Sequence, residues 1–311
     1  MLAQTAQGEA QMSIRPVKRA SVAQPTVEGA GVHLHRAFGF GETSAHDPFL
    51  LLDDFRNDRP EDYLKGFPWH PHRGIETITY VLAGNVTHGD SLGNEGTLGA
   101  GDVQWMTAGS GILHQEMPTG DATGRMDGFQ LWANLPASMK MTDPRYQDVV
   151  AKDVPEVVDD DGTRVRVVCG DFWGQKGPVE VAAADPRFLD VTVLPGQRRR
   201  LPVATENNAF AYVFEGSASF RDASPPQAVL TDVEGQERYV APDESGNRSL
   251  VLFDRGDEIV VQAGERGVRF LFVSGKPIEE PVAWRGPIVM NTQQELRDAF
   301  REFREGTFIR P

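Results

Sequence analysis

The chain of 311 residues is longer than a typical single domain, and its 40% hydrophobic and 24% charged residues are ordinary for a soluble globular protein. Its formal net charge of −14 argues against direct binding of DNA or RNA, which calls for a basic surface. The single cysteine, Cys169, excludes an intramolecular disulfide and favours a reducing compartment, so we expect a cytoplasmic protein. No run of 18 apolar residues predicts a membrane span.

The first part of the chain is predicted to form strands. Residues 1–14 are expected to be a disordered tail, and residues 17–37 then alternate polar and apolar as an edge strand or hairpin does. His33 and His35 share one face of that strand, either as a metal-binding pair or as ordinary strand histidines. Further strands are expected at residues 47–55, 77–82, 103–107 and 126–135.

Short strand-like runs continue through the second half of the chain. Gly, Pro, Asn and Asp separate them at the spacing expected of an all-β sandwich or barrel. The runs cover residues 164–168, 188–194, 209–214, 218–220, 249–253, 258–261 and 268–273.

One clear helix is predicted near the C-terminus, within residues 291–303. Thr292 and Glu295 have the spacing of a capping box, and Gly306 is placed to end the helix. An apolar stripe at helical spacing predicts a face that docks on the β body. The stripe consists of Leu296, Ala299, Phe300 and Phe303.

An internal repeat divides the chain into two related β domains. The segment 80–84, Tyr-Val-Leu-Ala-Gly, returns as Tyr-Val-Phe-Glu-Gly at 212–216, and the Gly-Asp pair at 101–102 returns at 256–257. The second copy has no histidines that match those of the first. A metal site is therefore expected in the first half only.

Two pairs of metal-ligating residue types flank the strands of the first half. His70 and His72 share a strand face, as do His114 and Glu116, so two strands lining one barrel would bring four ligands together. Three imidazoles and a carboxylate suit Fe, Mn, Ni, Cu or Zn and leave open coordination positions. The alternative is a set of solvated loop histidines.

Two neighbouring residues have several interpretations. Glu76 shares parity with His70 and His72, so it is either a fifth ligand, a hydrogen-bond partner of a ligand or a structural carboxylate. His88 follows the strand in a turn and is expected to be exposed.

The segments 70–77 and 101–118 resemble the pirin family of bicupins, as do segments 47–50 and 286–292. The resemblance implies an all-β bicupin of two stacked antiparallel jelly-roll barrels with a short C-terminal helix. It implies a metal-binding cupin domain over 15–148 and a degenerate cupin domain with the terminal helix over 149–311. It also implies one metal held by His70, His72, His114 and Glu116, with Fe(II) favoured and Mn, Ni, Cu, Co or Zn as alternatives.

The family resemblance implies two different activities. One is a quercetin 2,3-dioxygenase-like reaction, in which a flavonol or related enol reacts with O2 and Glu116, or Glu76 if it is free, acts as general base. Phe67, Trp69, Trp105 and Met106 are then candidates for the substrate pocket, with Glu76 nearby, although Trp105 suits a barrel core equally well. The other is a non-enzymatic, redox-dependent role in which the protein binds a transcription factor or metabolic enzyme, without nucleic-acid or membrane contact.

Overall fold

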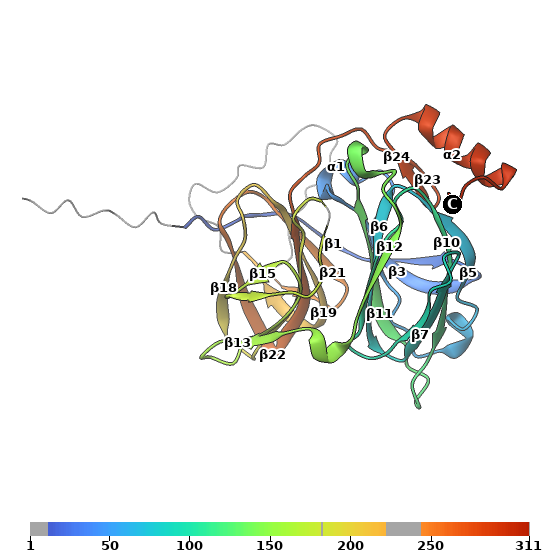
Figure 1. Ribbon diagram of the computed structural model, residues 1–311. Coiled ribbons are helices and arrows are strands. Elements are labelled where there is room, and N and C mark those ends of the chain that lie inside the picture. The colour runs from blue at the N-terminus through green and yellow to red at the C-terminus, as the bar shows by residue number, and fades with distance from the viewer. Residues whose placement is uncertain (1–11, 182, 222–243, 311) are drawn as a thin grey trace, which may run out of the picture.

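The computed structural model describes residues 12–181, 183–221 and 244–310, and consists of two β-barrels side by side (Figure 1). This confirms the all-β bicupin fold with a short C-terminal helix. Residues 1–11 of the predicted tail lie outside the described part. Residues 13 and 14, also predicted to be tail, contact the second barrel, because Ser13 N donates to Asp257 Oδ2 at 2.8 Å and Ile14 forms a bridge with Glu258.

The first barrel consists of a seven-stranded sheet facing a four-stranded sheet. In spatial order, the larger sheet contains β12 (Arg145–Val149), β9 (Val103–Thr107), β6 (Ile75–Ala83), β11 (Asp127–Asn134), β4 (Phe49–Asp54), β3 (Val32–Phe38) and β2 (Gln24–Glu28). The smaller contains β5 (Phe67–His72), β10 (Ile112–Thr119), β7 (Asn85–Asp90) and β8 (Glu95–Leu98). The connections carry the short helix α1 (Thr43–His46) and 3₁₀ turns at Pro60–Asp62, Ala137–Met139 and Ala151–Asp153.

The second barrel is built from one nine-stranded sheet. Its main path is β1 (Val17–Val22), β21 (Ser249–Phe253), β19 (Asn208–Ser219), β22 (Glu258–Gly275), β17 (Arg187–Val193), β14 (Arg164–Cys169) and β13 (Glu156–Val158). Off this path, β18 (Arg198–Pro202) pairs with β22 and β20 (Ser245–Gly246) pairs with β19. Two hairpins stand apart, β15 (Asp171–Phe172) with β16 (Gln175–Lys176) and β23 (Ala283–Arg285) with β24 (Ile288–Met290).

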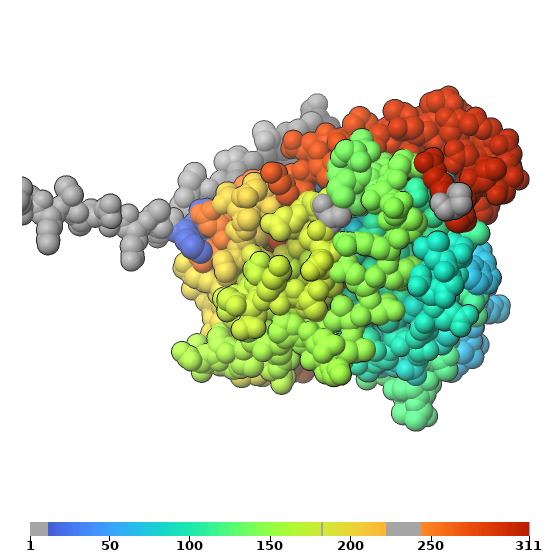
Figure 2. All heavy atoms as spheres, viewed as in Figure 1, coloured from blue at the N-terminus to red at the C-terminus, as the bar shows by residue number. Residues whose placement is uncertain are grey.

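Both ends of the chain pair with the barrel that is farther away in sequence. Strand β1 pairs with β21 of the second barrel, although the boundary at residue 15 assigns it to the first domain. The segment after residue 282 returns to the first barrel, where Val289 N donates to Arg73 O at 3.1 Å. The red C-terminal segment accordingly lies over the first barrel (Figures 1 and 2). The pairing of β1 with β21 covers a sheet edge that would otherwise expose unpaired backbone groups. The local sequence pattern does not show which barrel a terminal strand will pair with.

The C-terminal helix α2 (Gln293–Glu305) forms as predicted. Thr292 and Glu295 make the capping box, and Gly306 ends the helix in a left-handed conformation with φ of 73°. Leu296 and Ala299 are buried against the β23–β24 hairpin. Leu296, Ala299 and the partly buried Phe300 therefore form a docking face, as expected, whereas Phe303, also predicted to dock, is 41% exposed.

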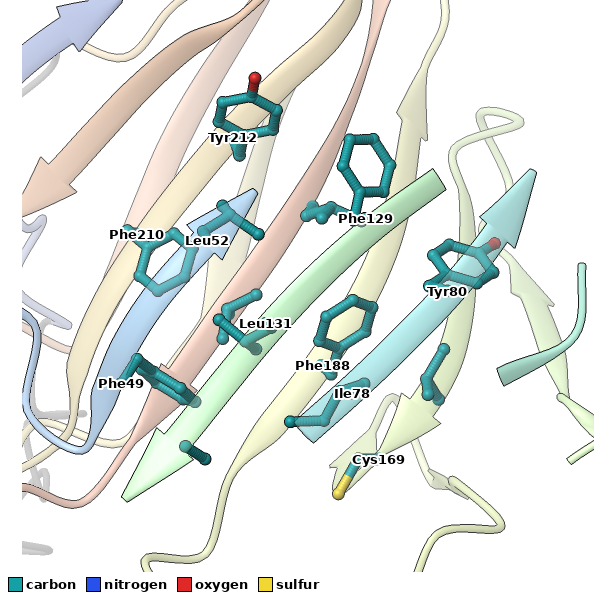
Figure 3. Close-up of a cluster of buried hydrophobic side chains, with 14 of the residues drawn as sticks. Phe49, Leu52, Ile78, Tyr80, Phe129, Leu131, Cys169, Phe188, Phe210 and Tyr212 are labelled. Carbon is teal, nitrogen blue, oxygen red and sulfur yellow. The ribbon is translucent and has the colours of Figure 1, made fainter. Parts of the chain in front are cut away.

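One large hydrophobic core lies between the two barrels. Ile78, Tyr80, Phe129 and Leu131 from β6 and β11 pack against aromatic residues of the second barrel, including Phe188, Phe210 and Tyr212 (Figure 3). Since side chains alternate along a strand, the residues between them on β6 and β11 face the interior of the first barrel. The second barrel has its own interior filled by Val, Phe, Ala and Leu side chains.

Candidate metal centre

The antiparallel pairing of β5 with β10 brings three predicted ligands together. His114 is directly opposite His70, and His72 lies two residues further along the same strand. The Nε2 atom of His70 is 3.1 Å from Nε2 of His72 and 2.9 Å from Nε2 of His114. Ligand atoms of the three histidines all lie within 4.8 Å of one another, the arrangement expected around a single metal ion.

Backbone carbonyl groups orient two of the three rings. Nδ1 of His70 donates to Pro68 O at 2.9 Å, and Nδ1 of His72 donates to Pro287 O at 3.1 Å. These bonds place the proton on Nδ1 and leave the Nε2 lone pair free. Burial lowers the pKa of His72 and of His114 well below the usual range, so both rings are neutral at pH 7.

The donor set fits a metal cation. Nε2 of His70 lies about 3 Å from Nε2 of His72 and of His114, and lone pairs that face each other at this distance repel unless a proton or a cation lies among them. Nδ1 of His114 is buried and has no hydrogen-bond partner among the described residues. Neutral imidazoles are good ligands for divalent transition metals and poor ligands for Ca²⁺ or Mg²⁺.

Glu116 faces the same interior but lies outside the group of ligand atoms within 4.8 Å. Its Oε1 atom accepts a hydrogen bond from Thr79 Oγ1 at 2.9 Å, and Thr79 Oγ1 also contacts Gln130 Oε1 at 2.7 Å. Burial raises the pKa of Glu116, although His70 and the Thr79 bond oppose this. Its role as fourth ligand stays a prediction.

A cavity of about 430 Å³ opens beside the histidines. His70, His72 and Glu116 form one end of it, and most of the wall is apolar or aromatic. Trp132 meets the ring of His72 edge to face at 5.1 Å, and the exposed Phe40 stacks on Trp284 at 3.9 Å. A flat aromatic molecule would fit such a wall.

Of the residues expected in the substrate pocket, Phe67 lines this cavity and the others do not. Trp69 is 55% exposed and points away from the barrel interior. Trp105 faces the second barrel as part of the core between the barrels, and Met106 is buried beside Val289. The apolar character of Trp105 and Met106 therefore reflects packing.

Of the three interpretations given for Glu76, its position in the structure fits the structural carboxylate. Gly74, with φ of 78°, turns the chain between β5 and β6, so residues before and after it no longer share one parity. Glu76 is buried on the side of β6 that faces the second barrel, where its Oε1 accepts from Thr107 Oγ1 at 2.8 Å. It is placed as a structural carboxylate.

The face of the strand on which each histidine lies decides the expectations for His88 and for the pair His33 and His35. His88 was expected to be exposed, which is wrong: it lies on β7, is 3% exposed and stacks on Tyr146 at 5.9 Å. His33 and His35 face out of the barrel and are not brought together with other ligands in the described part of the chain. His35 accepts a bond from Arg248 at 3.0 Å, as an ordinary strand histidine does.

Sequence reasoning missed most of the polar and aromatic residues that line the cavity, and five of them carry the argument below. They are Arg36, Asp53, Thr79, Gln130 and Trp132. Each lies on the inner face of a predicted strand, so the signal was the alternation of strand positions. Without the sheet order, however, that alternation does not tell the inner face of a barrel from the face that packs on its neighbour.

Comparison with known proteins gives consistent matches along the chain. A family model described as Pirin matches residues 31–133, and one described as Pirin C-terminal cupin domain matches residues 188–309. A pirin-like protein of Caulobacter vibrioides is 43% identical over 298 residues, which is 96% of this chain and 100% of that protein. In Pseudomonas aeruginosa, a relative named provisionally as a quercetin 2,3-dioxygenase is 39% identical over 94% of this chain and 97% of its own length.

Among solved structures, a quercetin 2,3-dioxygenase from Acinetobacter baumannii superposes with a TM-score of 0.82. It is 31% identical, and the match covers 95% of this chain and 99% of that one. Within the described residues, no helix is long and apolar enough to cross a membrane.

Proposed function

The chain belongs to the pirin family, and on that premise we propose that it is a metal-dependent dioxygenase acting on a flavonol or related enol with O2. The observation that carries the proposal is the opening of the three-histidine cluster into a largely apolar cavity of about 430 Å³. A closed structural metal site would have no such cavity. The relatives from P. aeruginosa and A. baumannii bear names of this activity.

His70, His72 and His114 would hold the metal, and Glu116 would complete the set. Fe(II) is the favoured ion, and Mn, Ni, Cu, Co or Zn would also suit three imidazoles. When bound, any of these ions would lower the pKa of a coordinated hydroxyl, and a redox-active one such as Fe(II), but not Zn, would supply the one-electron chemistry that O2 requires. The carbonyl groups of Pro68 and Pro287 would keep two of the rings aimed at it.

The remaining residues would bind the substrate and move its proton. Glu116, held by Thr79, would take the proton of the substrate hydroxyl, because its carboxylate is buried in the cavity at the end where the histidines lie. Trp132 and Phe40 would hold a flat ring, and the apolar wall would exclude water.

The test is an O2-consumption assay with quercetin, using protein loaded in turn with Fe(II), Mn(II) and Ni(II) and analysed for bound metal. We expect consumption by the wild type and a loss of at least about 100-fold in Glu116→Gln. His114→Ala should lose both metal and activity. His33→Ala, which changes an exposed histidine outside the cavity, is the matched control and should keep both.

If the wild type binds stoichiometric metal and consumes no quercetin or related enol, the dioxygenase proposal is wrong. The alternative hypothesis, a non-enzymatic regulatory role through a protein partner, would then be the one to test.

A further inference from the structure

A row of polar side chains crosses the inner face of the larger sheet of the first barrel. Arg36 on β3 is paired with Asp53 on β4, Asp53 with Gln130 on β11, and Gln130 with Thr79 on β6. The four side chains therefore lie side by side on adjacent strands, pointing away from the core between the barrels that Figure 3 shows. Flanking positions on the same strands carry mainly apolar residues, including Leu51, Phe55, Val81 and Trp132.

The row connects the candidate metal centre to an ion pair on the far side of the cavity. At one end, Thr79 bonds Glu116 at 2.9 Å. At the other, Arg36 makes a two-bond contact with Asp53, Nε to Oδ1 at 2.8 Å and Nη2 to Oδ2 at 2.7 Å. Neighbouring strands lie about 4.8 Å apart, so Asp53 and Arg36 are roughly 10 and 14 Å from Thr79 along the sheet. The cavity thus has polar groups at both ends and apolar walls between.

Several hydrogen-bonding positions at the far end are not used by the protein. The Asp53 carboxylate can accept about four bonds, and Arg36 supplies two. One atom of the Gln130 amide meets Thr79 Oγ1 at 2.7 Å, and the other amide atom makes no hydrogen bond among the described residues. Both side chains line the cavity. A barrel interior with spare donors and acceptors beside apolar walls suits a ligand that brings its own polar groups.

The charge at this end decides which polar groups fit. Arg36 pairs with Asp53 and also with Glu28, at 2.9 Å from Nη1, so the three side chains together carry a charge of −1. A carboxylate or phosphate would be repelled there. A neutral hydroxyl group can both donate and accept, so it can donate to Asp53 and also bond the unused amide atom of Gln130, which makes it the favoured partner.

From this arrangement, and resting on the function proposed above, we propose that Arg36, Asp53 and Gln130 form a second recognition site for ring hydroxyl groups. The substrate class is then a neutral, elongated aromatic with hydroxyl groups at both ends. A small enol or an organic acid would not reach or suit the far end.

The test compares two flavonols bound to zinc-loaded protein, which cannot carry out oxygen chemistry. Quercetin has hydroxyl groups on its outer rings, whereas 3-hydroxyflavone has only the one that would face the histidines. Titration should give a dissociation constant about tenfold or more lower for quercetin. The double variant Arg36→Met/Asp53→Leu, which removes the ion pair without leaving one charge buried alone, should bind the two with nearly equal affinity. Gln130→Leu should lose part of the preference without removing any charge.

The outcomes separate this proposal from the one it rests on. If quercetin and 3-hydroxyflavone bind wild type equally, or if the variants weaken both equally, the second site is refuted while flavonol binding stands. If neither flavonol binds the wild type, the proposed function itself fails. Thermal unfolding of each variant checks that it is folded, and 3-hydroxyflavone binding then serves as the internal reference.

Discussion

Removing the phenolic hydroxyl of Tyr80 or Tyr212 should weaken the contact between the two barrels. The hydroxyl of Tyr80, in the first barrel, donates to Asp190 of the second at 2.7 Å. The hydroxyl of Tyr212, in the second barrel, donates to Asp54 of the first at 2.8 Å. All four side chains are nearly inaccessible to solvent. Because the two tyrosines occupy the same place in the repeated Tyr-Val-x-x-Gly segment, the contacts are reciprocal.

The size of the effect follows from what remains after each substitution. A hydrogen bond to a charged group contributes about 1.5–3 kcal/mol. In Tyr80→Phe the Asp190 carboxylate keeps two bonds from Arg269, and in Tyr212→Phe the Asp54 carboxylate keeps those from Arg56. No carboxylate is left unpaired, so we expect the lower value, about 1.5 kcal/mol for each variant and about 3 kcal/mol for the double variant if the sites are independent.

Urea unfolding of the full chain measures these changes, and Tyr63→Phe is the control. Tyr63 is equally buried, but its hydroxyl donates to the neutral carbonyl of Gly124, at 2.8 Å and within one barrel. Its loss should cost about 1 kcal/mol or less. If Tyr80→Phe and Tyr212→Phe cost no more than Tyr63→Phe, the contacts do not hold the barrels together in the way argued here.

Three further outcomes are expected. Burial raises the pKa of Tyr80 and of Tyr212 in the folded protein. Above about pH 10 these tyrosines therefore lose their protons in the unfolded chain while they keep them in the folded one. The free energy of unfolding should fall as the pH rises through this range, and it should fall less steeply in the double Phe variant. Gly74→Ala should lower the free energy of unfolding by about 2 kcal/mol or more and weaken metal binding, because the added Cβ would lie 2.0 Å from Val289 O at a φ of 78°. Gly174→Ala is the control, since Gly174 has the same φ and its Cβ would meet no atom within 4 Å. Adding Ni(II) at 1,000 times its dissociation constant should stabilise the wild type by about 4 kcal/mol, and an equal gain in His72→Ala would contradict the assigned site.

The sequence predicts the fold well because each of its signals is local. Alternation marks the strands, the capping box marks α2, and the repeat marks the two barrels. The grouping of His70, His72 and His114 is also a local signal, since the i and i+2 spacing needs only one strand pairing to bring the rings together. What fails depends on the face of a strand within the assembled sheet. Glu76 and Trp105, for which the sequence leaves more than one interpretation open, both lie on the face toward the second barrel, and only the sheet order and the turn at Gly74 decide this.

The predicted domain boundaries did not allow for the first strand pairing with the second barrel or for the C-terminal segment packing on the first. The position of the C-terminal segment affects the histidine cluster directly. His72 is oriented by the carbonyl of Pro287, 215 residues later, in a segment expected to belong to the second domain. That segment is fixed to the first barrel by Arg73, whose guanidinium pairs with Glu302 at 2.7 Å and lies over the ring of Phe308 at 4.1 Å.

The three-histidine cluster is therefore completed by a segment near the C-terminal end of the sequence. The long motif that brings in all three rings does not by itself fix their orientation. The second barrel, whose interior is filled by apolar side chains, contributes no ligand among its described residues. Its role is to bury the outer face of the larger sheet. Burial of Ile78 and Leu131 on that face sets the side of β6 and β11 on which Thr79 and Gln130 must lie. The barrel without ligands thus determines the inner face of the barrel that has them.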